Sequence, residues 1–234
     1  MNASKYTTLS VLSCSLLLAG LIAADSTGTA VTGKVTYISS ETAATGPRAD
    51  GAVYTFVDSA DPAIASIVSL GYKTIDRVGG MLVSEVNREM AAKEPRLAVS
   101  IMHNKDLQLP KPVPGQPKIT AIKRTSLLIR NPQNAPDGAD QAALELIHKQ
   151  LMADEAPDKV VVQKIEQPGQ PLEWRVYRPI ATSQSCLACH GDPKTFPAGV
   201  KEALDALYPE DKALDYGAQE YRGMLRVSIT PAAK

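Results

Sequence analysis

Apolar residues recur at helical spacing in the stretch that follows Asp61, which can cap a helix with Pro62 in its first turn. The pattern continues to Pro95 and predicts the longest helix of the chain, which Gly79-Gly80 could interrupt. The apolar positions are Ile64, Ile67, Val68, Ile75, Val78, Met81, Leu82 and Val86.

The next segments are shorter. An apolar run at 97–103 fits either a strand or a short helix, and 105–118 contains four prolines, which predicts a loop. Prolines at 132 and 136 favour an extended, turned path up to Asp137. Asp137 can then cap a helix over 138–153.

The C-terminal third predicts antiparallel strands. Two β-branched runs, 159–166 and 172–180, flank a Pro-Gly turn and indicate a hairpin. A short helix is expected at 200–207, and 223–231 alternates apolar and polar residues as a strand does. Helices followed by an antiparallel sheet predict the α+β class.

Composition excludes several kinds of protein. The 234 residues hold 25 basic and 25 acidic side chains, so the net charge is zero and no basic surface for nucleic acid is expected. The three cysteines are too few for a disulfide framework. A core formed by ordinary apolar burial is therefore expected.

The N-terminus resembles an export signal. Lys5 precedes an apolar stretch over 9–23, and the small residues Ala23 and Ala24 offer a cleavage site before Asp25. We expect a signal peptide at 1–24, a polar tether or peripheral strands at 25–60, and the main domain at 61–234, in the periplasm. An uncleaved membrane anchor is the alternative, and the signal segment would then be the only contact with the membrane.

The candidate chemistry lies at Cys186-Leu187-Ala188-Cys189-His190, a Cys-x-x-Cys-His sequence. This is the pattern of covalent haem attachment. Two thiols at this spacing can bond the two vinyl groups of a porphyrin, and the following His190 can bind the iron as proximal ligand. One motif predicts one haem c, attached through Cys186 and Cys189.

Three other interpretations of the motif remain. A zinc site would need a further ligand, which His103 or His148 could supply. A thioredoxin-like redox pair would begin a helix after a buried strand in a βαβ unit, whereas a polar turn leads into this motif. A plain disulfide is the third alternative.

The motif and the residues around it in combination resemble a family of exported haem-c-binding PAS-like domains (the Tll type), known from cyanobacteria and proteobacteria. The resemblance covers roughly residues 62–231 and implies a five-stranded antiparallel PAS-like sheet, a long N-terminal helix, flanking helices and one haem. It rests on Lys123 to Leu127, Arg130 to Asp137, Tyr177 to Ile180, Cys186 to Pro193 and Tyr221 to Gly223.

The resemblance also implies a position for the second axial ligand. Family members carry a segment of the type Ala-Ile-x-Val-Cys whose cysteine binds iron opposite the histidine, and this chain has Ala98 to Met102 there. Met102 takes the place of that cysteine, and a thioether is a common axial ligand. The adjacent His103 is the alternative, and a core methionine is the structural interpretation.

Other residues could contact the haem. Its propionates are carboxylates, which Arg124, Arg130 or Arg178 could pair with, although each could equally be a surface charge. Tyr177 could pack against the porphyrin from an expected strand.

Three functional classes follow from these residues. We predict a monohaem c-type cytochrome that acts in electron transfer or redox sensing, with a redox partner protein or a membrane sensor component as its partner. A haem-based gas sensor is the alternative. A peroxidase-type enzyme would need a distal acid-base residue, for which only His103 is near in sequence, so the chain is not expected to be an enzyme.

Overall fold

The computed structural model of the protein describes residues 51–92, 94–103 and 107–232. The predicted signal peptide and most of the predicted tether lie outside these residues. No helix in the described part combines the length and apolar character of a membrane span.

A five-stranded antiparallel sheet forms the centre of the domain, in the order β1-β3-β4-β5-β2. The predicted hairpin and last strand are present, and the expected α+β class with its five-stranded sheet is confirmed. Strand β1 pairs with β3 at one edge, so residues before 61 take part in the sheet. The strands are β1 Val53–Val57, β2 Lys118–Thr125, β3 Val161–Glu166, β4 Glu173–Ala181 and β5 Tyr221–Thr230.

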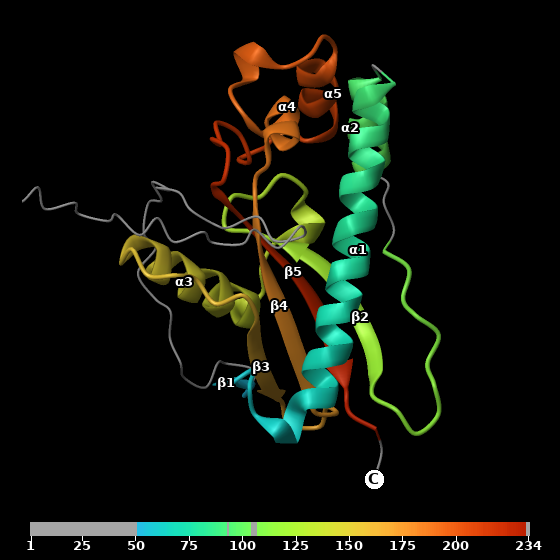
Figure 1. Ribbon diagram of the computed structural model, residues 1–234, viewed down its shortest axis with the longest axis vertical. Helices are drawn as coiled ribbons and strands as arrows, with labels where there is room; N and C mark the ends of the chain where they lie inside the picture. The colour runs from blue at the N-terminus through green and yellow to red at the C-terminus, as the bar shows by residue number, and fades with distance from the viewer. Residues whose placement is uncertain (1–50, 93, 104–106, 233–234) are drawn as a thin grey trace, which may run out of the picture.

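Helix α1, Ala65–Ala91, covers one face of the sheet without a break at Gly79-Gly80. A 3₁₀ turn at Pro62–Ile64 precedes it, and the Asp61 side chain accepts a hydrogen bond from the Ala63 amide there. The buried face of α1 packs on apolar side chains of β3, β4 and β5. Figure 1 shows α1 running the full height of the sheet and beyond it, where helix α2, Pro95–His103, lies beside it.

Strand β2 was not predicted, and a β-bulge explains why. Ile119 and Ile122 both face α1, although residues three apart in a regular strand face opposite sides. The pairing of β2 with β5 shifts register between Ile119 and Ala121, and this extra residue restores the common face. The bulge thus removes the alternation by which a strand is recognised.

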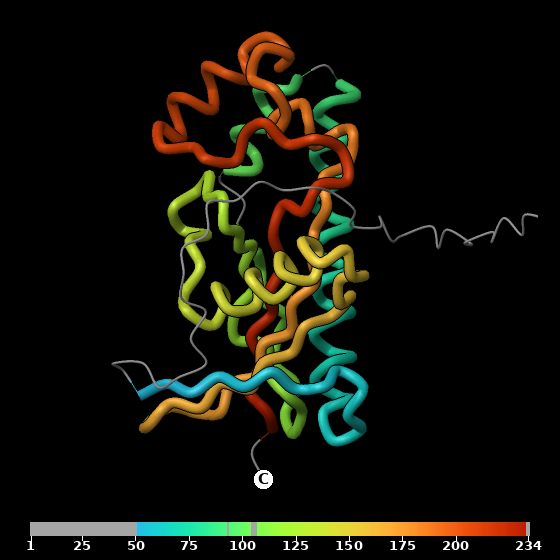
Figure 2. The backbone as a smooth tube through the Cα atoms, turned by 90° about the vertical axis from the view of Figure 1, so that its left-hand side faces the viewer, coloured from blue at the N-terminus to red at the C-terminus, as the bar shows by residue number. Residues whose placement is uncertain are grey.

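Helix α3, Gly138–Met152, covers the other face of the sheet, as Figures 1 and 2 show. Asp137 caps it, as predicted, through a capping box with Asp140. The fully buried Asp140 carboxylate then accepts hydrogen bonds from four side chains, three of them cationic, so α3 is fixed to the sheet by charge as well as by apolar contact. The donors are Lys123, Arg175, Tyr177 and Arg226.

Two short helices, α4 (Leu187–His190) and α5 (Val200–Leu207), lie beyond one end of the sheet. Helix α2 lies at the same end. α5 has the predicted bounds. Val99 of α2 packs against Val200 and Leu204 of α5, and Cys189 of α4 contacts the same cluster. The upper end of the domain is thus closed by helices from distant parts of the chain.

Helix α1 lies close against the sheet at Gly71. A Cβ atom there would lie 2.5 Å from the Cβ of Val176, closer than real Cβ contacts. We expect Gly71→Ala to lower the free energy of unfolding by about 1 kcal/mol or more through overpacking, measured by urea denaturation. Gly80→Ala is the control, since nothing lies within 4 Å of its Cβ position, and it should gain about 0.5–1 kcal/mol of helix propensity. Equal effects of the two substitutions would contradict the close contact.

Candidate cofactor-binding site

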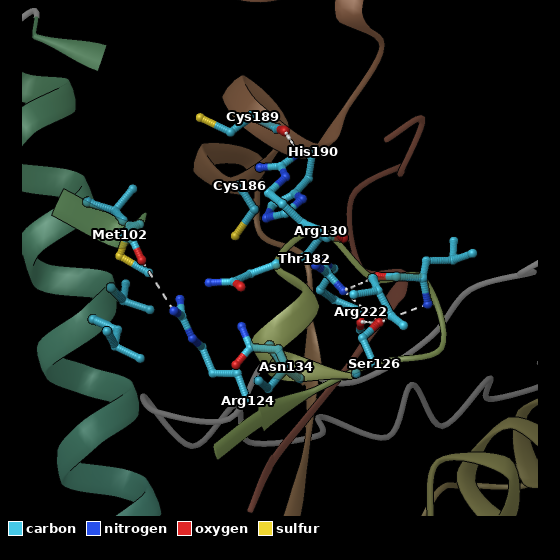
Figure 3. A pocket seen from close by; sticks show the side chains of 18 of the residues that line it. Met102, Arg124, Ser126, Arg130, Asn134, Thr182, Cys186, Cys189, His190 and Arg222 are labelled. Atoms are coloured by element: carbon cyan, nitrogen blue, oxygen red, sulfur yellow. Dashed lines mark hydrogen bonds between the residues drawn. The ribbon is translucent and has the colours of Figure 1, made fainter. Parts of the chain in front are cut away.

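A cavity of about 250 Å³ lies where α1, α2, α4 and α5 meet the ends of β2, β4 and β5. Its wall is mainly apolar, and the polar groups come from a few side chains on β2, on β5 and in the loops (Figure 3). The apolar lining includes Leu82, Val86, Val99, Met102, Ile129, Ile180, Leu204 and Met224. An apolar wall with a few convergent polar groups is typical of cofactor sites.

The Cys-x-x-Cys-His sequence forms the part of this wall opposite α2. A 3₁₀ turn, Gln184–Cys186, leads directly into α4, so Cys186, Cys189 and His190 all lie on the cavity. Both thiols are free and half-buried. The amide and hydroxyl of Ser183 contact the Cys186 sulfur at 3.3 and 3.2 Å, which fixes the start of the turn.

His190 is held in one tautomer. Its Nδ1 lies 2.8 Å from the carbonyl oxygen of Ala213, and because a carbonyl only accepts, Nδ1 must carry the proton. Burial lowers the pKa of His190 well below its ordinary value, and the positive charges of Arg222 and Arg130 lower it further. The imidazole is therefore neutral, with Nε2 available as a metal ligand.

Segment 211–216 wraps around α4 and is tied to it by Arg130. The Arg130 Nε donates to Asp211 Oδ2 at 2.8 Å, and its Nη2 donates to the carbonyls of Cys189 and Ala213. The backbone amide of Tyr216 donates to the carbonyl of His190 at 2.9 Å, and its ring contacts the imidazole edge-to-face. The part of the site around His190 is thus a connected hydrogen-bond network.

Met102 and His103 end α2 but have different surroundings. Met102 lines the cavity and lies across it from Cys186 and His190 in Figure 3. His103 is not among the lining residues, and its Nδ1 is hydrogen-bonded to the Tyr208 hydroxyl at 2.9 Å. Of the two expected candidates for the second axial position, only Met102 is placed on the cavity.

Two arginines present positive charge to the cavity without a carboxylate of the described residues in ion-pair distance. Arg124 donates to the carbonyl of Met102 at 3.3 Å, and burial lowers its pKa. Arg222 donates to Ser126 Oγ at 2.6 Å and to the Leu128 carbonyl at 3.1 Å, while its buried Nε has no hydrogen-bond partner. Two such guanidinium groups on one cavity favour an anionic occupant.

Three of the expected cofactor contacts have other partners in the structure. Arg130 reaches the cavity, but its charge is paired with Asp211 and its donors hold α4. Arg178 is paired with Asp76 of α1 and is not on the cavity. Tyr177 is fully buried on the α3 face of the sheet, bonded to Asp140 and Gln163, and cannot contact a group in this cavity.

Arg222 was not predicted as a site residue. It was visible only as part of the Tyr221–Gly223 string, and nothing in its local pattern distinguished it from other arginines. Its position follows from the pairing of β5 with β4 and from Gly223, where a Cβ would clash with the Thr125 carbonyl oxygen. Glycine is required at this position because, at a φ of +145°, a side chain would point into the neighbouring strand β2.

The alternative interpretations of the motif find little support. Among the described residues, no three His, Cys, Asp or Glu side chains gather to hold a metal ion, so no zinc site is preformed. The motif follows β4 and leads to β5, but these strands are antiparallel, so the motif is not part of a βαβ unit. The cysteines are not joined by a disulfide.

The fold and the site together define an α+β domain with a Cys-x-x-Cys-His turn on the wall of an apolar cavity. The Tll0287-like family matches residues 82–230, well over half of the chain. The chain belongs to the Tll0287-like family.

Among solved structures, the chain is similar to the cyanobacterial heme-protein Tll0287, with 26% sequence identity and a TM-score of 0.36. The match covers 48% of this chain and 62% of that protein, less than two thirds of its length. No curated protein matches the chain.

The Arg130–Asp211 pair should be important for stability. Both side chains are nearly buried, with 11% and 8% exposed, and removing one partner leaves the other charge uncompensated. We expect Asp211→Ala to cost about 3 kcal/mol or more of unfolding free energy, measured by urea denaturation of the haem-free protein. Asp205→Ala, in the exposed Lys201–Asp205 pair, is the control and should change it by about 0.5 kcal/mol or less. A small effect at Asp211 would show that the wrapped segment is held by other contacts.

Proposed function

We propose that this protein is a periplasmic monohaem c-type cytochrome that acts in electron transfer or redox sensing. Haem c, when bound, supplies an iron that exchanges one electron. The observation that carries the proposal is that a neutral His190 and Met102 lie on opposite walls of one apolar cavity, beside two free thiols.

The thiols and His190 fit the attachment of haem. Cys186 and Cys189 would form the two thioether bonds, and His190 Nε2 would bind the iron because Nδ1 is engaged by the Ala213 carbonyl. Membership of the Tll0287-like family adds support, since the protein Tll0287 is described as a heme-protein.

The two cavity arginines without a carboxylate partner also fit a bound haem. A haem carries two propionate carboxylates, and Arg124 and Arg222 offer two guanidinium groups on the cavity. Charge-assisted pairs with carboxylates would satisfy the buried Arg222 Nε and offset the cost of burying both cations. An uncharged occupant would leave that cost in place.

Met102 would be the second axial ligand. A thioether opposite an imidazole saturates the iron, favours the ferrous state and suits one-electron exchange. A gas sensor would require Met102 to give way to a ligand. A peroxidase would require an acid-base group on the distal wall, and the nearby histidine, His103, faces Tyr208 and does not line the cavity.

The proposal also includes the periplasm as the compartment and a redox partner. Attachment of haem c takes place after export, and the N-terminal segment over 1–24 has the character of a signal peptide. The partner would be a redox protein, or a membrane sensor component, that exchanges electrons with the haem.

Removing either thiol tests covalent attachment. Cys186→Ala or Cys189→Ala, produced in a host with c-type haem assembly, should lose most of the haem stain on a denaturing gel because one thioether bond or none remains. Ser185→Ala is the matched control, since Ser185 also lines the cavity but carries no thiol, and it should keep the stain. A full-strength band from both cysteine variants would contradict covalent attachment.

Removing the thioether tests the second axial position. The ferrous wild-type protein should not bind carbon monoxide, whereas Met102→Ala should bind it with a shift of the Soret band, because the sixth position is then vacant. His103→Gln, which can still hydrogen-bond Tyr208, should behave as the wild type. Binding of carbon monoxide by the wild type would favour a sensor, and binding by His103→Gln alone would assign the ligand to His103.

A further inference from the structure

Arg130 and His190 share one acceptor. The carbonyl oxygen of Ala213 accepts from His190 Nδ1 at 2.8 Å and from Arg130 Nη2 at 3.0 Å. Two donors on one oxygen compete for its electron density, and the donor that carries the positive charge draws on it more strongly. The hydrogen bond to His190 is therefore weaker than an unshared one.

We infer that Arg130 is a positioning residue that limits the electron donation of His190 to the iron, and so raises the reduction potential. The inference rests on the proposed function. A strong hydrogen bond from Nδ1 gives the ring imidazolate character and makes Nε2 a better donor, which stabilises ferric iron. By competing for Ala213, Arg130 keeps the ring close to a neutral imidazole.

The geometry around Arg130 supports a defined role. Its Nε is paired with Asp211 Oδ2, and Asp211 Oδ1 accepts from the Ala213 amide at 2.8 Å. One carboxylate thus holds both the guanidinium and the peptide unit next to the shared carbonyl. The same Nη2 also donates to the carbonyl of Cys189, within the attachment motif.

Asp211 sets how strongly Arg130 competes. Its negative charge offsets the positive charge of Arg130, and both side chains are nearly buried, so the pair is little screened by solvent. Neutralising Asp211 should make Arg130 a stronger competitor. Neutralising Arg130 should release the Ala213 carbonyl to His190. The two substitutions therefore have opposite expected effects on the proximal histidine.

The test uses the iron–histidine stretching band of the ferrous protein by resonance Raman spectroscopy, in a Met102→Ala background that leaves the iron five-coordinate. In this background, Arg130→Gln should raise the frequency of the band. In the protein that retains Met102, the same substitution should lower the reduction potential. Asp211→Asn, which keeps an oxygen for the Ala213 amide, should lower the frequency and raise the potential. Mere loosening of the structure would move both variants in the same direction.

Arg130→Lys separates the shared hydrogen bond from charge alone. Lysine keeps the charge but has no planar fork with which to bond Asp211 and two carbonyls together. We expect its band to shift upward, as in Arg130→Gln. A band at the wild-type position in Arg130→Lys or Arg130→Gln would overturn the inference. If the Arg130 variants do not retain haem, an unshifted band in Asp211→Asn would overturn it. A wild-type protein matured without covalent haem would instead overturn the proposed function, and the inference with it.

Discussion

The cavity exists because α1 is longer than the sheet on which it packs. Its 27 residues span about 40 Å, whereas the ten residues of β5, the longest strand, span about 33 Å. The first half of α1 is pressed onto β4 at Gly71, where no side chain larger than hydrogen fits. In the second half, Val78 and Leu82 still pack on the sheet, and the helix then continues past it. Leu82, Val86 and Asn87 face the space that α2, α4 and α5 close on the other sides. The close contact at one end thus sets the wall at the other.

The buried carboxylates of Asp140 and Asp211 are paired with cations, whereas Arg124 and Arg222 on the cavity have no carboxylate of the described residues in ion-pair distance. Asp140 gathers three cations beneath α3, and Asp211 pairs with Arg130 behind α4. Both clusters join segments far apart in the chain, and both are closed by partners from the protein itself. Arg124 and Arg222 differ because no carboxylate of the described residues offsets them. The contrast separates charges that are paired within the protein from two charges on the cavity that have no such carboxylate partner.

The elements with a clear hydrophobic period and the residues of a motif with fixed spacing could be predicted from the sequence. α3, α5, the β3–β4 hairpin and the Cys-x-x-Cys-His turn follow from local signals. Sequence reasoning missed β2, where a bulge breaks the alternation, and Arg222, whose role depends on strand pairing. It placed Tyr177 at the cofactor, although Tyr177 and Val176 face opposite sides of the sheet and only the Val176 side meets α1. The Ala213 carbonyl could not be predicted at all, because a backbone group has no sequence signal.

The two sides of the cavity are held in different ways, and this difference bears on how the site works. His190 is fixed by hydrogen bonds through Ala213, Arg130 and Tyr216, so its position is specified by direction as well as by packing. Met102 is held through the apolar contacts of α2 and by one hydrogen bond from Arg124 to its carbonyl. Apolar contacts are not directional, so α2 can shift with less loss than α4. Arg124 also lines the cavity, so one guanidinium group contacts both the cavity and the C-terminal end of α2.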